Sequence, residues 1–96
     1  GPASQLFKRA IHMSYLQGQK FAIDEIFTLI DENQIDEEFL IQYNNFEKYV
    51  QDQNLEKKFT FSNFTDIPRQ FDDFMASFYY LKGQNFIVTH INSIIE

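Results

Sequence analysis

Apolar residues at helical spacing dominate this sequence and restrict it to a mainly α-helical fold. The clearest case lies in residues 36–54, where Phe39, Tyr43, Phe46 and Val50 recur at intervals of four, three and four. This spacing places all four side chains on one face of a helix and predicts that this face is buried. Three acidic residues, 36–38, begin the segment, where negative charge favours the positive end of the helix dipole.

Similar patterns predict three further helices, over residues 5–17, 23–32 and 67–82. Each has an apolar stripe: Leu6, Ala10 and Met13 in the first; Ile23, Ile26, Phe27 and Ile30 in the second; Ile67, Phe71, Phe74, Phe78 and Leu81 in the last. Pro68 suits the first turn of that last helix, because its missing N–H is not needed there.

Breaks between these helices are predicted from glycine, from polar residues and from changes of period. Gly18 and Gly83 each follow the expected end of a helix, where glycine is common. The polar residues 31–34 are expected to end the second helix. Residues 20–22 and 59–61 are predicted to be short extended links.

The C-terminal segment changes from helical to strand-like composition. Residues 85–90 are rich in β-branched and aromatic side chains, residues 91–93 suit a turn, and Ile94 and Ile95 suit a returning strand. We therefore expect a terminal β-hairpin. The alternative is a plain four-helix bundle, and the conformation of residues 86–95 decides between the two.

Length and composition indicate one domain. The chain has 96 residues, of which 44% are hydrophobic and 18% aromatic, enough for a single core. Gly1 to Ala3 is typical of what a tag-removing protease leaves, so we assign the domain to residues 4–96. The chain contains no cysteine, which excludes disulfides and thiolate sites and fits a reducing, intracellular compartment. No run of about 18 apolar residues is present to span a membrane.

The order of elements resembles a winged helix with an extra inserted helix. Residues 21–27 resemble its short first strand entering the second helix, and residues 74–95 resemble its recognition helix followed by the wing. This last part is similar to the C-terminal winged-helix domains of the middle subunit of replication protein A and of its telomeric relative in the CST complex. It is also similar to the C-terminal winged helices of MCM helicase subunits.

The resemblance implies a non-catalytic protein–protein interaction domain of a nuclear DNA replication or telomere maintenance complex. A helical wheel of the last predicted helix adds candidate partner-binding residues on its solvent face: Arg69, Asp72, Asp73, Tyr79 and Tyr80. Two aspartates there would repel DNA phosphates, whereas tyrosines with mixed charge are typical of protein interfaces. Alternatively, both tyrosines pack against the wing or against the inserted helix of residues 36–54.

Two other functions remain open. A nucleic-acid-binding domain would use Lys8, Arg9 and Lys20, although the net charge of −6 argues against strong phosphate contacts. A structural dimerisation module is the other alternative, because twelve phenylalanines can leave an apolar patch too large for a monomer.

No enzymatic, metal or cofactor site is predicted. Residues 31–42 lack the glycine and the final glutamate of a calcium loop, and His12 and His90 are far apart in sequence. The serines have no nucleophile-elbow glycines around them, and no phosphate-binding glycine loop is present.

Overall fold

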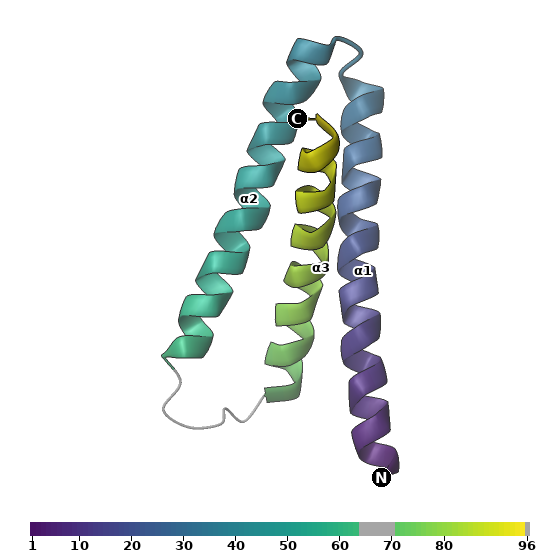
Figure 1. The fold of residues 1–96 in the computed structure, drawn as a ribbon, viewed down its shortest axis with the longest axis vertical. Helices are drawn as coiled ribbons and strands as arrows, with labels where there is room; N and C mark the ends of the chain where they lie inside the picture. Colours follow the sequence, from purple (N-terminus) through teal and green to yellow (C-terminus); the bar gives the residue numbers. More distant parts are fainter. Residues whose placement is uncertain (64–70, 96) are drawn as a thin grey trace.

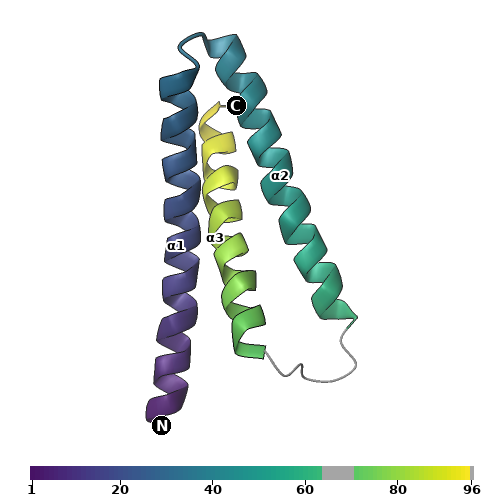
Figure 2. The ribbon, with the colours of Figure 1, turned by 180° about the vertical axis from the view of Figure 1, so that it is seen from behind.

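Three long helices make up the described part of the chain, residues 1–63 and 71–95 of a computed structural model. They are α1 (Pro2–Glu32), α2 (Asp36–Ser62) and α3 (Phe71–Ile95). α1 and α3 run in the same direction, and α2 runs opposite to both (Figure 1). α3 lies between the other two helices (Figure 2). It packs most extensively on α1 and less on α2, and α1 and α2 make few contacts with each other.

The predicted winged helix is wrong. Residues 85–95 continue α3 as helix, and the described residues contain no strand. The alternative, a helical bundle, is correct in class, with three described helices in place of four. The β-branched composition of residues 86–91 reflects burial: Ile87 and Val88 lie in the core, and their packing outweighs their modest preference for strands.

Several predicted breaks are also wrong, because the segments around them are helical. The first two predicted helices are one, since α1 continues through Gly18 and residues 20–22. Residues 59–61 belong to α2, and Gly83 lies inside α3. Neither glycine has a positive φ. The predicted start of the last helix, at residue 67, lies outside the described residues.

Both interior glycines allow α1 and α3 to approach backbone to backbone. A Cβ atom on Gly18 would overlap the carbonyl oxygen of Tyr80, and one on Gly83 would overlap the carbonyl oxygen of Tyr15. Each glycine is buried, and each faces the main chain of the other helix. Close contact between the helices therefore explains why glycine occurs there, at a cost of about 1 kcal/mol each in helix propensity.

The predicted stripe on residues 36–54 is confirmed as the buried face of α2. Tyr43 and Val50 are buried, and Phe39 and Phe46 pack against the core cluster that also contains Ala22, Ile26 and Ile87. Phe46 also approaches Phe21 of α1 at 6.4 Å between ring centroids, and Phe21 lies 6.1 Å from Tyr80 of α3. Aromatic rings thus join the three helices at mid-length.

A short turn joins α1 to α2 as the polar residues predicted. Asn33 ends α1, and both its backbone N–H and its side-chain amide donate to the carbonyl of Leu29, each at 3.0 Å. Ile35 precedes the first helical residue of α2, and Asp36, Glu37 and Glu38 form the acidic first turn. These bonds satisfy backbone groups that the helix end leaves free.

The fold is elongated, which limits what it can bury. Its extents are 50 × 29 × 21 Å, and its radius of gyration is 15.7 Å, against about 13 Å for a compact domain of this size. Only seven hydrophobic residues of the described part are buried, whereas seventeen large hydrophobic side chains are exposed. α1 and α2 each pack mainly on α3, which leaves the outer side of each without a neighbour among the described helices.

Candidate interaction surface

The predicted partner-binding residues do not form one exposed face. Asp72 and Asp73 lie in the first turn of α3 and are exposed, whereas Tyr79 and Tyr80 are half-buried. Arg69 lies outside the described residues. The role of these residues in partner binding stays a prediction.

Contacts inside the domain account for the partial burial of both tyrosines. The ring of Tyr80 meets Phe21 of α1, and its carbonyl oxygen is the atom closest to Gly18. Tyr79 contacts Phe78 edge to face at 5.7 Å between centroids, and the Lys82 ammonium lies 5.7 Å from the Tyr79 ring. Tyr80 therefore packs between α1 and α3.

A shallow groove brings together residues from two separate predictions. It has a volume of about 350 Å³, and it is lined by Lys8, Ile11, His12, Tyr15, Met75 and Tyr79. Lys8 was a candidate nucleic-acid contact, and Tyr79 a candidate partner contact. Arg9 lies beside a neighbouring hollow with Lys8, His12 and Met13, whereas Lys20 lies three turns further along α1.

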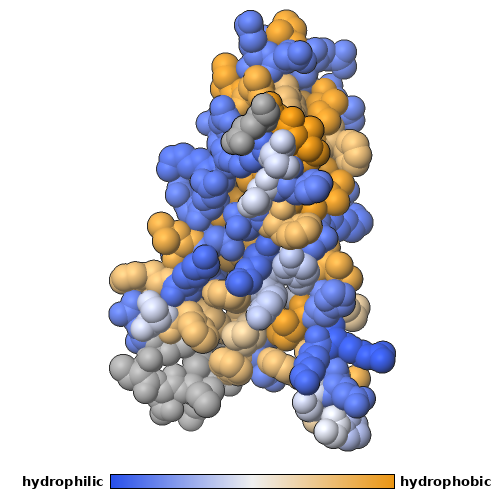
Figure 3. Space-filling view, viewed as in Figure 1, coloured by the Kyte–Doolittle hydropathy of each residue, from blue (hydrophilic) through white to orange (hydrophobic). Residues whose placement is uncertain are grey.

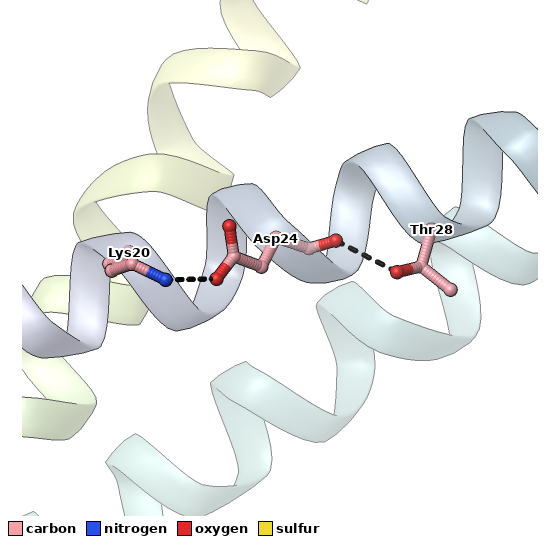
Figure 4. A network of polar contacts seen from close by, with 3 residues as sticks. All are labelled: Lys20, Asp24 and Thr28. Carbon is pink, nitrogen blue, oxygen red and sulfur yellow. Dashed lines mark hydrogen bonds and ion pairs between the residues drawn. The ribbon is translucent and has the colours of Figure 1, made fainter.

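Lys20 is paired within its own helix. Its Nζ lies 2.6 Å from a carboxylate oxygen of Asp24, and the carbonyl of Asp24 accepts a hydrogen bond from Thr28 at 3.0 Å (Figure 4). The hydrogen bond and the charge of Asp24 raise the pKa of Lys20. Asp24 thus already neutralises the Lys20 ammonium, which weakens Lys20 as a phosphate contact.

The largest regular surface feature is a row of residues along the outer side of α1. We call it the outer seam, and its members recur at intervals of three and four: Leu6, Arg9, Met13, Leu16, Lys20, Ile23, Phe27 and Ile30. Its six apolar members are all at least 40% exposed, and Leu6 reaches 68%. This alternation is that of the a and d positions in a coiled coil.

The outer seam lies opposite the face of α1 that packs on α3. The buried residues of α1 are Gly18, Ala22, Ile26 and Leu29. At about 100° per residue, the middle of this buried set lies roughly opposite the middle of the seam, and Ile26 lies only about 40° to 60° from Ile23 and Ile30. α1 is consequently apolar on two opposite sides, and only one is covered. Figure 3 shows apolar surface, in orange, interrupting the polar surface along the length of the molecule.

A buried polar network joins α2 to α3, and its role is structural. The Tyr43 hydroxyl lies 2.7 Å from Oδ1 of Asn92 and 3.1 Å from the carbonyl of Val88. The Asn92 amide in turn donates to the Glu47 carboxylate. Burial, and then the charge of Glu47, raise the pKa of Tyr43 to about 12.

Residues 1–63 and 71–95 offer no cluster of three or more His, Asp or Glu side chains placed to hold a metal ion. Among the same residues, no helix is long and apolar enough to cross a membrane.

Division of α1 into two helices concealed the outer seam from the sequence prediction. Leu6 and Met13 belonged to one predicted helix, and Ile23, Phe27 and Ile30 to another, so each group was an ordinary inner stripe. Continuous numbering through Gly18 reveals the unbroken spacing of three and four. The signal was present in the sequence, but the glycine was taken as a helix end.

No family model matches this chain, and neither curated proteins nor solved structures match it. The comparisons therefore neither support nor refute the resemblance to winged-helix domains.

Proposed function

We propose that this chain is a structural dimerisation module, a non-catalytic helical domain that associates through apolar helix faces. The observation that carries the proposal is the imbalance between exposed and buried apolar side chains. In the described residues, seventeen large hydrophobic side chains are exposed and seven hydrophobic residues are buried. Single exposed apolar residues are ordinary, but a contiguous row is typical of an association surface.

Six of these exposed side chains belong to the outer seam and follow one side of one helix. Burying such a row against another helix removes apolar area from water, at about 25 cal/mol per Å². A helix that is apolar on two opposite sides is typical of one with neighbours on both. These features support association rather than a catalytic role.

The test is the mass of the protein in solution, measured by light scattering or sedimentation equilibrium over a wide concentration range. We expect a mass approaching twice the chain mass of 11.5 kDa at higher concentration. Association driven by apolar surface should also persist in high salt, because added salt screens only charges. A constant monomer mass over the whole range would contradict the proposal.

Nucleic-acid binding remains a prediction with a direct test. Lys8, Arg9 and Lys20 are exposed, but Lys20 is paired with Asp24, and the chain carries a net charge of −6. In a fluorescence anisotropy titration with labelled single- and double-stranded DNA, we expect no binding at physiological salt. Salt-sensitive binding would show that the basic end of α1 contacts phosphates.

The replication, telomere and nuclear roles have no support from this fold. The resemblance implied them through a terminal hairpin, and the residues of that hairpin are helical.

A further inference from the structure

The outer seam lies where another helix can reach it. α1 is at one edge of the layer of three helices, with α3 between it and α2 (Figures 1 and 2). The side of α1 that carries the seam faces away from α3, because Gly18 and Ala22 on the opposite side are buried. A second helix can therefore lie along the seam without displacing α2 or α3.

The charges of α1 are divided along its length. All its lysine and arginine residues, Lys8, Arg9 and Lys20, precede all its acidic residues, Asp24, Glu25, Asp31 and Glu32. A parallel pair of α1 helices would place basic ends together and acidic ends together. An antiparallel pair places the basic end of each helix beside the acidic end of the other, which charge complementarity favours.

The outer seam is also complementary to the outer seam of a second copy when the two α1 helices are antiparallel. In antiparallel coiled coils, a positions pack against d positions of the partner. With Leu6, Met13, Lys20 and Phe27 at a, and Arg9, Leu16, Ile23 and Ile30 at d, one register matches every member. It pairs Leu6 with Ile30, Arg9 with Phe27, Met13 with Ile23, and Leu16 with Lys20 of the second copy. The two-fold axis then passes at the level of Gly18.

Neither charged member of the seam is left unpaired in this register. Arg9 lies opposite Phe27 of the second copy, and Asp31 of that copy lies one turn beyond Phe27. The Arg9 guanidinium can therefore stack on the Phe27 ring and pair with the Asp31 carboxylate. Lys20 lies opposite Leu16 near the centre, and Asp24 on its own helix already neutralises its ammonium (Figure 4). Its aliphatic stem can cover apolar surface while the charge stays at the edge.

We propose that two copies of this chain associate through the outer seam, with their α1 helices antiparallel and Met13 of each copy against Ile23 of the other. This inference rests on the proposed dimerisation function and specifies its surface, direction and register. Self-complementary contact about a two-fold axis is the usual geometry of a closed dimer. The occupant is a second copy of this chain, because residues of α1 alone form both halves of every pair in this register.

The chain has no cysteine, so introduced cysteines report the register directly. Met13→Cys and Ile23→Cys each change one exposed side chain of α1. After mild oxidation of an equal mixture of the two variants, we expect a disulfide-linked dimer. Each variant alone should give none, because two copies of the same position lie about 15 Å apart along the antiparallel axis, beyond the reach of a disulfide. Leu6→Cys with Ile30→Cys is a second pair with the same expectation.

The outcomes separate this inference from the proposed function. A cross-link in each variant alone would show a parallel pair and overturn the inference, while dimerisation stands. A dimeric mass without any cross-link in either mixture would place the interface elsewhere. A monomeric mass for the unmodified chain would contradict both. Circular dichroism of each reduced variant checks that the helices are retained.

A substitution without cysteine gives independent evidence. Phe27→Ala removes the largest apolar side chain of the seam and should raise the dimer dissociation constant at least tenfold. The matched control is Leu55→Ala on α2, whose side chain is similarly exposed and which should leave dissociation unchanged. Equal effects of the two substitutions would overturn the assignment of the interface to α1.

Discussion

The hydroxyl of Tyr43 on α2 and the side-chain oxygen of Asn92 on α3 are joined by a hydrogen bond of 2.7 Å. Tyr43 is only 1% exposed, so its hydroxyl needs a partner inside the protein. Asn54, three turns along α2, donates to the carbonyl of Leu81 on α3 at 2.8 Å. These two polar contacts fix how α2 lies along α3, because sliding either helix would leave buried groups without partners.

Removal of the Tyr43 hydroxyl should destabilise the fold. We expect Tyr43→Phe to lower the free energy of unfolding by about 1–2 kcal/mol, since Asn92 loses its donor while the aromatic ring stays in place. Urea denaturation at a fixed protein concentration measures this change. Tyr49→Phe is the matched control, because Tyr49 is exposed on the same helix. Equal stability of the two variants would show that the network contributes nothing.

Stability should fall at alkaline pH because of the same residue. The pKa of Tyr43 is raised to about 12 from its ordinary value of 10.0. Its contribution is therefore fully present below pH 10 and is lost as the pH rises from 10 to 12. Urea denaturation across this range should show the native protein losing stability relative to Tyr43→Phe. If the free energies of unfolding of the two proteins changed equally with pH, the raised pKa of Tyr43 would be contradicted.

A methyl group at either interior glycine should separate α1 from α3. We expect Gly18→Ala and Gly83→Ala each to destabilise the fold by about 2 kcal/mol or more, because the new Cβ overlaps a backbone carbonyl that cannot rotate away. At an exposed helical site the same change would stabilise by about 1 kcal/mol. Thermal denaturation compares these variants with Gln17→Ala, an exposed neighbour. A stabilised Gly18→Ala would disprove the close approach.

Substitution of Gln84, unlike the preceding substitutions, should stabilise the fold. Its side chain is buried on α3, and its Oε1 has no hydrogen-bond partner in the described residues. An unsatisfied buried carbonyl is unfavourable, so the apolar Gln84→Met, of similar shape, should stabilise the fold by about 1 kcal/mol. Chemical denaturation tests this, with Gln42→Met on the exposed side of α2 as control. A destabilised Gln84→Met would show that the amide has a partner in the native protein.

Local patterns predicted the parts of this fold in which one helix face is buried and the other is polar. The stripe of Phe39, Tyr43, Phe46 and Val50 identified the inner face of α2, because its neighbours on the opposite face are mostly polar. The acidic first turn of α2 and the polar end of α1 were predicted for the same reason, since caps and dipoles act within one turn.

The candidate surface could not be predicted as easily, because α1 has two apolar sides. From the sequence alone, Leu6 and Met13 are as reasonable a core stripe as Ile11 and Ala22. Contact with α3 decides between them, and it depends on where the two glycines allow the backbones to meet. Tyr79 and Tyr80 illustrate the same limit, since a helical wheel places them in solvent and packing half-buries them.

The amino-acid sequence by itself determined that this protein is helical, because helical periodicity and capping are local properties of neighbouring residues. It determined equally the charge division along α1 and the spacing of the outer seam. Only the tertiary structure decided that Gly18 and Gly83 lie inside helices and that residues 85–95 are helical. A glycine ends a helix or permits close contact according to what packs against it, and β-branched residues adopt the conformation that buries them.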